Sequence, residues 1–361
     1  YGGLGLPLKG HTWQNEKNWG YRSFKSRQAL QAAYLKLLDP LQHMIRSHLG
    51  AAIYTQTTDV EVEVNGLMTY DREVLKFDLK QLTQAHSQLF TPLRRLSAAE
   101  KSQAYTVAYW RFEDGKPGAL MPHDRKKREG VAVTDSSGQR NHLYAYGKGN
   151  APRQGMDVAA PLIPRLGLPN RGSLDDSAKI AGPTRDLYTN AGRSRTHMNV
   201  INTFPFTQWT LEASIKPVEL GRTQTIVGED GKPTPGPNAP LQLNLRKDNH
   251  IAIVAIDSTG KVRSVASREP LNAGSWKHVA AISDGKQLKL YLVQDGKYEL
   301  QGEVLFTGKL INHPGTWTIG RGFHNGKLAQ DARAHVDEVR VSSIALPSEL
   351  LLWTGEPKAN Q

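Results

Sequence analysis

Residues 276–292 read WKHVAAISDGKQLKLYL, and this stretch decides the fold predicted for most of the chain. Two segments rich in apolar residues, KHVAAI and LKLYLV, are separated by SDGKQ at 283–287. An Asp-Gly pair between two such segments is typical of the tight turn of a β-hairpin. The stretch is therefore predicted to form two neighbouring antiparallel strands.

The same pattern of short, alternating strands continues on both sides of this hairpin, from Tyr105 onward. The segments are separated by turns that contain Gly, Pro, Asn and Asp. Strands at this spacing are typical of an antiparallel β-sandwich. The other predicted strands are YTVAYWRF (105–112), WTLEASIKP (209–217), TQTIVGED (223–230), LQLNLR (241–246), HIAIVAI (250–256), TWTIGRG (316–322) and HVDEVRVS (335–342).

This part of the chain resembles the laminin-G-like, concanavalin-A-like sandwich module that is attached to many bacterial secreted enzymes. The resemblance spans roughly residues 106–353, and we place the domain at 105–353, followed by a tail at 354–361. It implies a β-sandwich that is either carbohydrate-directed or purely structural. The matching pieces are AYWRFEDG (108–115), DSSGQRNHL (135–143), FTQWTLEASIKP (206–217), the hairpin, and HVDEVRVSSIALPSELL (335–351).

Residues 1–90 follow a different pattern. Apolar residues at helical spacing within 23–48 predict a surface helix that stops at Gly50. An apolar segment at 51–54 follows, and a helix before a buried strand is the αβ half of a barrel repeat. A second amphipathic helix is predicted at 79–89. The polar stretch at 91–104 is predicted to be a linker.

The first part also resembles a known family. The sequences YGGLGLPLKGHTW (1–13) and YTQTTDVEVEVNGLMTYDR (54–72) are similar to the end of the catalytic barrel in family-two glycoside hydrolases, which include β-galactosidases and β-glucuronidases. The resemblance covers roughly residues 1–78. It implies that residues 1–90 are the incomplete C-terminal end of a (β/α)₈ barrel, with 50–56 as its last strand.

This resemblance has consequences for activity. It implies that the nucleophilic Glu lies just ahead of Tyr1 and that the acid/base Glu lies further upstream. The chain therefore contains neither catalytic carboxylate, and we expect it to be inactive alone. One and a half repeats cannot bury both faces of a barrel strand, so we expect Ile53 to be exposed.

Four residues are candidates for contact with a sugar at the barrel end. Tyr54 and Gln56 lie at the C-terminal end of the candidate strand, where active sites of such barrels form. The resemblance implies that Tyr54 floors the sugar subsite, and the alternative is a core tyrosine with a satisfied hydroxyl. His11 and Trp13 either line the same pocket or pack in their loop.

Asp59 is a fifth candidate for substrate binding. It alternates with valines along one segment that also carries Glu61 and Glu63. This segment is predicted to be extended, so its three carboxylates should point to the same side, and they cannot easily supply the facing pair that glycoside hydrolysis needs. Asp59 then either contacts substrate or belongs to a solvated or salt-bridged rim.

The sandwich contains candidate ligands for calcium and for sugars. Asp135, Asn141 and Asp337 offer the hard oxygen donors that calcium prefers. The alternative for Asp135 is a turn, DSSG, whose Asp caps its own backbone. Three tryptophans in or beside predicted strands are candidates to stack on sugars, but packing in the core or half in the core is favoured for each of them: Trp209, Trp276 and Trp317.

Composition narrows the classes of function. The 361 residues include no Cys, so the chain has no disulfide and no thiolate metal site. The formal net charge is +12, but HDRKKR at 123–128 is the single dense basic run and lacks interleaved aromatics, so we expect no nucleic-acid partner. No apolar run approaches the length of a membrane span. Walker, HExxH and GxSxG motifs are absent.

Two functions follow from these patterns. The first is the C-terminal part of a retaining glycoside hydrolase that acts on β-linked sugars, with an accessory carbohydrate-binding or structural sandwich. The alternative is a stand-alone carbohydrate-binding or adhesion protein. Both imply a carbohydrate partner, no cofactor required for catalysis, and a secreted or periplasmic location.

Overall fold

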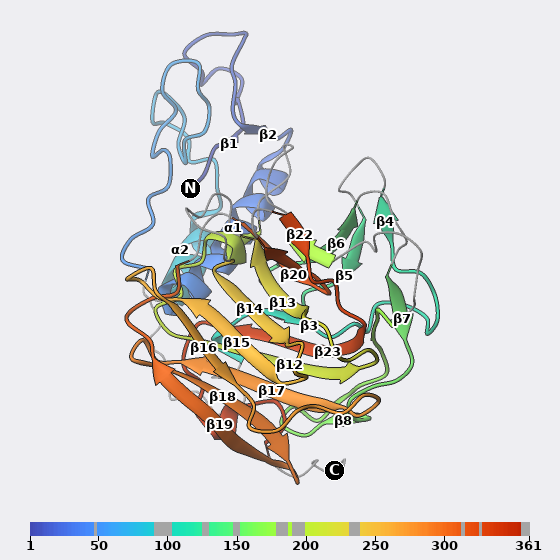
Figure 1. The fold of residues 1–361 in the computed structure, drawn as a ribbon. Coiled ribbons are helices and arrows are strands. Elements are labelled where there is room, and N and C mark those ends of the chain that lie inside the picture. The colour runs from blue at the N-terminus through green and yellow to red at the C-terminus, as the bar shows by residue number, and fades with distance from the viewer. Residues whose placement is uncertain are drawn as a thin grey trace. The chain divides into compact units, whose positions relative to one another are not determined.

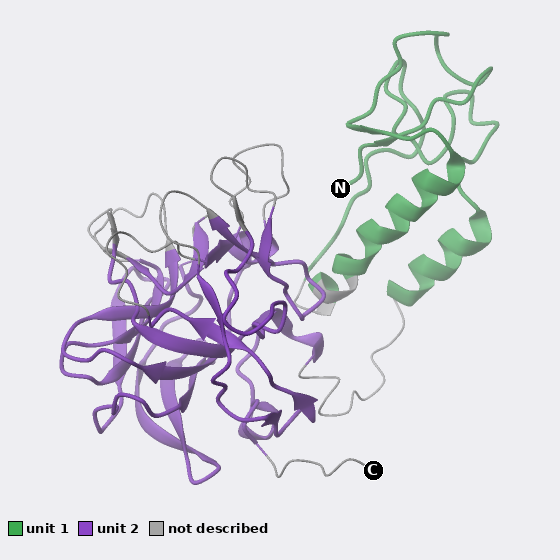
Figure 2. Ribbon diagram, turned by 90° about the vertical axis from the view of Figure 1, so that its right-hand side faces the viewer, with its two compact units in different colours: residues 1–96 green, residues 97–361 purple. Residues whose placement is uncertain are grey.

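The computed structural model describes residues 1–46, 49–89, 103–124, 130–146, 152–177, 187–189, 199–230, 239–311, 315–324 and 327–354. The chain divides into two compact units, Tyr1–Leu96 and Ser97–Gln361 (Figure 2). The boundary falls inside the stretch predicted as a linker. Most of that stretch and nearly all of the predicted tail lie outside the described residues.

The second unit is a β-sandwich of two sheets (Figure 1). One sheet has eight described strands in the order β19-β18-β17-β12-β23-β10-β7, with β3 also paired to β23. Its strands are β3 (Thr106–Trp110), β7 (Arg153–Gly155), β10 (Ser173–Asp175), β12 (Trp209–Pro217), β17 (Lys277–Ser283), β18 (Gln287–Gln294), β19 (Lys297–Leu305) and β23 (Ala334–Ser342).

The opposite sheet has nine described strands in the order β16-β15-β14-β13-β20-β11-β6-β4, with β5 beside β6. Its strands are β4 (His123–Asp124), β5 (Val131–Val133), β6 (Leu143–Tyr146), β11 (Leu187–Thr189), β13 (Gln224–Asp230), β14 (Leu241–Leu245), β15 (Ile251–Ile256), β16 (Val262–Ala266) and β20 (Thr316–Ile319). Smaller elements are β8 (Leu162–Ile163), β9 (Leu168–Pro169), β21 (Gly322–His324), β22 (Lys327–Ala329), η1 (Val200–Thr203) and η2 (Ser348–Leu350).

The predicted hairpin is confirmed. Strands β17 and β18 pair antiparallel, with Val279 opposite Leu292. Between them, the Asp284 carboxylate accepts hydrogen bonds from the backbone N–H groups of Lys286 and Gln287, each at 2.8 Å. Gly285 has a φ of +82°, a backbone conformation that glycine adopts without steric cost. The predicted β-sandwich is therefore correct, and the turn chemistry explains the register of this strand pair.

The main core lies between the two sheets. Alternate residues of β12, such as Leu211 and Ala213, pack in one cluster with Leu241 and Leu243 of β14. Full burial of a leucine is worth roughly 1.5–3 kcal/mol, and this cluster contains many such side chains. Trp209 and Trp317 are 2% and 1% exposed, so the prediction that these two pack in the core is confirmed.

The outer face of the eight-stranded sheet is also covered. In β12 the residues that alternate with the core positions are buried, although they are polar: Thr210, Glu212 and Ser214. A second apolar cluster explains this, because Leu346, Leu350 and Leu351 of the C-terminal segment pack with Ala280 of β17. Polar groups under this cover must find partners within the protein, since an unpaired buried polar group is costly.

The first unit contains the helices α1 (Arg27–Arg46) and α2 (Leu79–Leu89) and the short strands β1 (Leu4–Gly5) and β2 (Arg22–Ser23). Both predicted helices are present. The Asp78 side chain caps α2 by accepting a hydrogen bond from the backbone N–H of Gln81 at 2.8 Å. Leu30 and Tyr34 of α1 pack in one cluster with Leu82 of α2.

The described residues of the first unit form no barrel sheet. Strands β1 and β2 pair parallel over two residues each, and the predicted last barrel strand is reduced to an isolated parallel bridge between Gly2 and Thr55. The prediction of a strand at 50–56 is wrong, since Thr55 alone forms a bridge there, and Ala51 and Ala52 are exposed beside Ile53. The expected exposure of Ile53 is confirmed at 80%. A strand of this kind stays buried only when neighbouring strands and helices cover it.

Among the described residues, no helix combines the length and the apolar character needed to cross a membrane.

Candidate functional sites

Asp59 is buried rather than exposed on a rim. Its Oδ1 accepts a hydrogen bond from Lys76 Nζ at 2.6 Å and from the backbone N–H of Gly66 at 2.8 Å. Asp59 and Lys76 are 2% and 0% exposed. Burial raises the pKa of Asp59, and Lys76 opposes that effect. The salt-bridged alternative fits this arrangement, and the two buried charges tie the 59–66 loop to the segment that precedes α2.

The segment with alternating acids and valines is not extended. Residues 60–63 form a tight turn, in which the backbone groups of Val60 and Glu63 bond to each other and Glu61 has a φ of +50°. The prediction that Asp59, Glu61 and Glu63 point to one side is therefore wrong. The alternation of acidic residues and valines predicted a strand. The buried Asp59 carboxylate, paired to Lys76, stabilises a loop here instead.

Tyr54 and Gln56 come shortly before this turn in the sequence, and both side chains are half-buried. The Tyr54 ring contacts Tyr34 and Tyr1 edge-on, with centroids 5.1 and 5.4 Å apart. Burial raises the pKa of Tyr54 to about 12. Gln56 Nε2 donates to the backbone oxygen of Glu63 at 3.4 Å. Tyr54 is thus half in the core and half accessible, so contact with a sugar stays a prediction.

His11 and Trp13 come from the loop before β2. His11 Nδ1 lies 2.7 Å from Asp71 Oδ2, and Trp13, 55% exposed, packs edge-on against Tyr70 at 4.8 Å between centroids. The structure thereby brings both residues to the 69–74 turn. Among the described residues, no hydrogen bond or ring contact joins them to Tyr54 or Gln56. One alternative had His11 and Trp13 line the same pocket as Tyr54 and Gln56, and the direct contacts of these four residues divide them into two groups.

The three predicted calcium ligands do not come together: Asp135 and Asn141 contact each other, whereas Asp337 bonds to Asn170 and Ala159 instead. Asp135 Oδ1 accepts from the backbone N–H groups of Tyr109 and Ser137, and its Oδ2 accepts from Ser137 Oγ and the Asn141 N–H. Asn141 in turn donates to Val107 O and accepts from the Ile201 N–H. Asp135 therefore caps its own turn and fastens that turn to β3, as the alternative interpretation had it.

Asp337 lies elsewhere, on the outer face of β23. It is completely buried, and its Oδ2 accepts hydrogen bonds from Asn170 Nδ2 at 2.7 Å and from the Ala159 N–H at 3.2 Å. Asp337 Oδ1 and Asn170 Oδ1 have no hydrogen-bond partner in the described structure. Burial, followed by the neighbouring Glu338, raises the pKa of Asp337 well above its ordinary value. Among the described residues, no ion pair compensates this buried carboxylate.

Trp276 differs from the other two predicted tryptophans because its indole is partly exposed. Its Nε1 donates to Asp157 Oδ1 at 2.9 Å, and Lys216 Nζ donates to the other oxygen of the same carboxylate. The His335 ring lies 6.3 Å from the indole, between centroids. Burial raises the pKa of Asp157, but the bonds from Lys216 and Trp276 outweigh it and lower that pKa. We call Trp276, Asp157, Lys216 and His335 the Trp276 patch.

The Trp276 patch has a mixed chemistry. Lys216 and His335 are paired across strands β12 and β23, and Trp276 immediately precedes β17. The sheet therefore places three of the four side chains beside one another, while Asp157 comes from the loop before β8. An aromatic ring flanked by an ammonium, a carboxylate and an imidazole offers one apolar face together with hydrogen-bond donors and acceptors.

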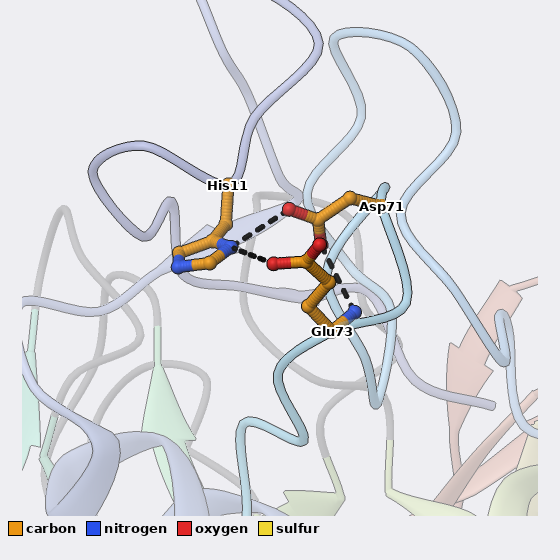
Figure 3. Close-up of side chains that lie close together, drawn as sticks. All are labelled: His11, Asp71 and Glu73. Atoms are coloured by element: carbon orange, nitrogen blue, oxygen red, sulfur yellow. Dashed lines mark hydrogen bonds and ion pairs between the residues drawn. The ribbon is translucent and has the colours of Figure 1, made fainter.

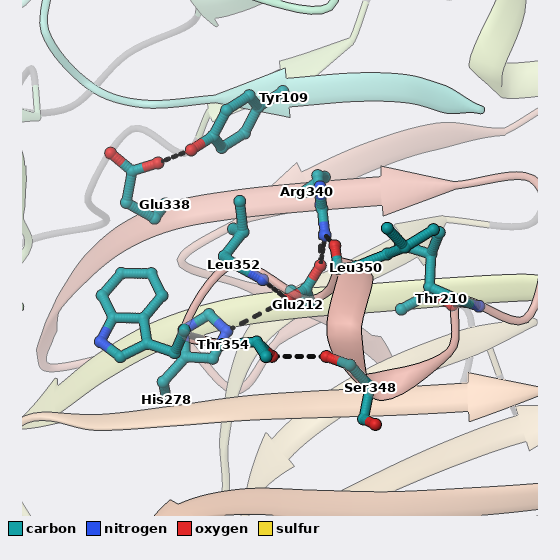
Figure 4. A network of polar contacts seen from close by, with 12 residues as sticks. Tyr109, Thr210, Glu212, His278, Glu338, Arg340, Ser348, Leu350, Leu352 and Thr354 are labelled. Carbon is teal, nitrogen blue, oxygen red and sulfur yellow. Dashed lines mark hydrogen bonds and ion pairs between the residues drawn. The ribbon is translucent and has the colours of Figure 1, made fainter. Parts of the chain in front are cut away.

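A second network lies under the C-terminal segment (Figure 4). The Glu212 carboxylate accepts from Arg340 Nε at 2.7 Å, from Tyr298 OH at 3.1 Å and from the Leu352 N–H at 2.8 Å. His278 stacks on Trp353, with ring centroids 4.2 Å apart, and burial lowers the pKa of His278. The Glu212 side chain is completely buried, and its bond from the Leu352 N–H ties the C-terminal segment to the sheet.

Sequence reasoning missed Asp157, Lys216, His335 and Asn170. Asp157 and Asn170 lie on either side of the short strands β8 and β9, in a segment whose course no local pattern predicts. Lys216 and His335 were visible as polar positions in predicted strands, and alternation alone placed them on the face away from the core. What the sequence lacked was the pairing of β12 with β23, which brings them together.

Comparison with known proteins agrees with the fold of the second unit. Residues 190–350 match the family model described as the concanavalin A-like lectin/glucanases superfamily. This part of the chain is therefore similar to that superfamily, and its described strands belong to the β-sandwich. The match does not extend to residues 1–78 and gives no support to the predicted glycoside hydrolase part. No curated protein matches the chain.

Several solved structures resemble part of the chain. The binding domain of Paraclostridial Mosquitocidal Protein 1 is 12% identical, with a TM-score of 0.45, and the match covers 70% of this chain and 52% of that one. The receptor binding domain of Botulinum Neurotoxin Type G is 11% identical, with a TM-score of 0.42 and coverage of 68% and 50%. The CBM40 domain of the Ruminococcus gnavus IT-sialidase, bound to alpha2,3 sialyllactose, is 17% identical, with a TM-score of 0.36 and coverage of 44% and 88%. The chain thus spans about half the length of the two toxin domains.

Proposed function

We propose that the second unit is a carbohydrate-binding module and that the Trp276 patch is its sugar site. The observation that carries the proposal is the contrast among the three tryptophans. Trp209 and Trp317 are buried in the core. Trp276 is partly exposed and donates a hydrogen bond to the Asp157 carboxylate, which also binds Lys216. A pyranose offers an apolar face to an indole and hydroxyl groups to the surrounding charged groups. The lectin-type family match of residues 190–350 supports the same function.

The test uses the full chain on a glycan array, followed by calorimetric titration with the best glycan. We expect Trp276→Ala to weaken binding at least tenfold, about 1.4 kcal/mol, without lowering the melting temperature of the protein by more than a few degrees. Trp19→Ala, which removes a tryptophan that is 43% exposed in the first unit, is the matched control and should bind normally.

Two outcomes contradict this proposal. Loss of binding in Trp13→Ala but not in Trp276→Ala would move the sugar site to the first unit, to the residues that the hydrolase resemblance names. Binding of no glycan by the intact chain would mean that the sandwich is purely structural.

A structural calcium ion is proposed at Asp337 rather than at Asp135. Both oxygens of Asp135 and both polar ends of the Asn141 amide are engaged by the protein, so these two residues do not fit an ion. Asp337 Oδ1 and Asn170 Oδ1 are buried hard donors without partners in the described structure. We expect calcium to raise the melting temperature of the chain above its value in EDTA, and Asp337→Asn to abolish the difference. An equal rise in Asp337→Asn would exclude this position.

A second candidate function concerns the first unit. The parallel bridge between Gly2 and Thr55, with helix α1 between the two segments, is the connection of a β-α-β repeat. This observation favours the proposal that residues 1–78 belong to the end of a family-two hydrolase barrel, in a secreted or periplasmic retaining glycosidase. The test is to express the reading frame extended upstream of Tyr1 and assay nitrophenyl β-glycosides. Turnover that disappears when a Glu directly ahead of Tyr1 is replaced supports this function, and no turnover in the extended protein contradicts it.

A further inference from the structure

Three potential metal ligands meet in the first unit, at the 69–74 turn that His11 contacts. His11 Nδ1 lies 2.7 Å from Asp71 Oδ2 and 3.9 Å from Glu73 Oε2. One ligand atom from each residue lies within 4.8 Å of the other two. Figure 3 shows both carboxylates turned toward the same nitrogen of His11. Two separate loops therefore converge on one small volume.

The spacing of these atoms suits a small divalent ion. Zinc binds imidazole nitrogen and carboxylate oxygen at about 2.0–2.2 Å, which places tetrahedral ligand atoms about 3.4 Å apart. The two distances from His11 Nδ1 lie on either side of that value. To share an ion, Asp71 Oδ2 has to move away from His11 Nδ1 and Glu73 Oε2 has to move closer to it, each by less than about 1 Å.

Hydrogen bonds within the 69–74 turn orient the Asp71 carboxylate toward His11. Asp71 Oδ1 accepts hydrogen bonds from Thr69 Oγ1 at 2.6 Å and from the Glu73 N–H at 3.1 Å, which leaves Oδ2 directed at His11. The bond from Thr69, with that from the Glu73 N–H, lowers the pKa of Asp71 to about 2. The carboxylate is therefore ionised over the whole physiological range. Metal-binding carboxylates are commonly oriented by such outer contacts.

The composition of the cluster selects the class of ion. A simple ion pair with His11 needs one carboxylate, whereas here two carboxylates face a single imidazole, so the cluster is negative even when His11 is protonated. An imidazole nitrogen favours zinc and its first-row neighbours over calcium and magnesium, which prefer oxygen donors alone. His11 and Asp71 are each about one-third exposed, which leaves room for water or a further ligand to complete the coordination.

We propose that His11, Asp71 and Glu73 bind one divalent transition-metal cation of the zinc class. The ion would fasten the loop that carries His11 to the 69–74 turn. His11 and Asp71 are separated by 60 residues in the sequence. The site is independent of the sugar-binding function proposed above, because all three ligands lie in the first unit.

The experiment is calorimetric titration of the metal-free full chain with zinc, and in parallel with calcium. We expect one zinc site per chain and at least tenfold weaker zinc binding in each of His11→Ala, Asp71→Asn and Glu73→Gln. Glu16→Gln removes another exposed carboxylate of the same loop and should bind zinc normally.

A second readout keeps the test independent of folding. Thermal unfolding of each metal-free variant shows whether it remains folded, and zinc should raise the melting temperature of the unmodified chain but not that of Asp71→Asn. The proposal is overturned if zinc binds with unchanged affinity to all three variants, since the ion then sits on other histidines. Calcium binding as tight as zinc binding, or the absence of a zinc site, would overturn it equally.

Discussion

Arg340 on β23 donates from its Nε to Glu212 Oε2 on β12 at 2.7 Å, across 128 residues of sequence, and both side chains are buried. Arg340 also donates to the backbone oxygen of Leu350 at 2.8 Å. One guanidinium therefore joins two neighbouring strands to the segment that covers them. Burial opposes ionisation of Glu212, but Arg340 and His278 outweigh it and hold the pKa of Glu212 at about 2.

Arg340→Met should destabilise the protein by about 3–5 kcal/mol, because it leaves the Glu212 carboxylate buried without its counter-charge. The measurement is equilibrium unfolding in urea. The double variant Arg340→Met/Glu212→Leu should recover a large part of the loss, since it removes the uncompensated charge. As a control, Lys289→Met removes one partner of an exposed pair with Glu303 at 3.5 Å and should change the free energy of unfolding by less than about 1 kcal/mol. A similar, small effect of both single substitutions would contradict the structural role given to Glu212.

Leu290 and Leu305 lie on adjacent strands of the β18–β19 hairpin and provide a matched comparison of burial. Leu290 is 0% exposed in the main core, whereas Leu305 is 61% exposed. Leu290→Ala should cost about 2–5 kcal/mol in the free energy of unfolding, as a cavity-forming substitution does. Leu305→Ala should stay within about 0.5 kcal/mol. Comparable costs in a urea titration would mean that the register of β18 and β19 differs from the one described.

Gly285 is required by the hairpin turn. Its φ is +82°, and a Cβ atom added there would lie 3.1 Å from the backbone oxygen of Thr207. Gly285→Ala should cost about 1–2 kcal/mol, since an L-residue is strained in this conformation. In Gly130→Ala the added methyl group meets nothing closer than 3.9 Å, at Pro122, so we expect little loss there. Thermal unfolding of both variants is the check, and a Gly285→Ala protein as stable as Gly130→Ala would disprove the turn geometry.

Asp257 should make stability depend on pH. It lies in the turn between β15 and β16, where its carboxylate accepts from Thr259 Oγ1 at 2.5 Å and from Arg263 Nε at 2.8 Å. Burial raises the pKa of Asp257, but these bonds outweigh it and lower the pKa to about 2. A carboxylate whose pKa is lower in the folded state stabilises the protein above its unfolded pKa and loses that effect as the pH falls toward the folded pKa.

The prediction is a difference between two proteins. Above about pH 5 the unmodified chain should be more stable than Asp257→Asn, and the gap in the free energy of unfolding should shrink steadily from about pH 4 toward pH 2. Urea unfolding at a series of pH values measures the gap. A gap that stays constant over this range would show that the pKa of Asp257 is the same in the folded and unfolded chain.

The strands of the sandwich could be predicted because each carries its own alternation. In β12 the residues Leu211 and Ala213 face the core while Glu212 faces away, and the pattern repeats in the strands around it. The Asp284-Gly285 turn is equally local, since its carboxylate and backbone bonds lie within four residues. The same reasoning failed at 50–63. There Ile53 has no covering neighbour, and Asp59 is held by Lys76, which no local pattern identifies.

The sequence by itself determined the sandwich class, both helices of the first unit and the hairpin turn, because periodicity and turn chemistry act over a few residues. Only the tertiary structure decided which polar groups meet. Long-range strand pairing sets Lys216 beside His335, the loop before β8 brings Asp157 to Trp276, and the two loops of the first unit carry His11 to Asp71. Contacts of this kind depend on how segments that are distant in the sequence pack against one another. The free energy that favours one packing arrangement comes from burying the whole core rather than from any local stretch of the chain.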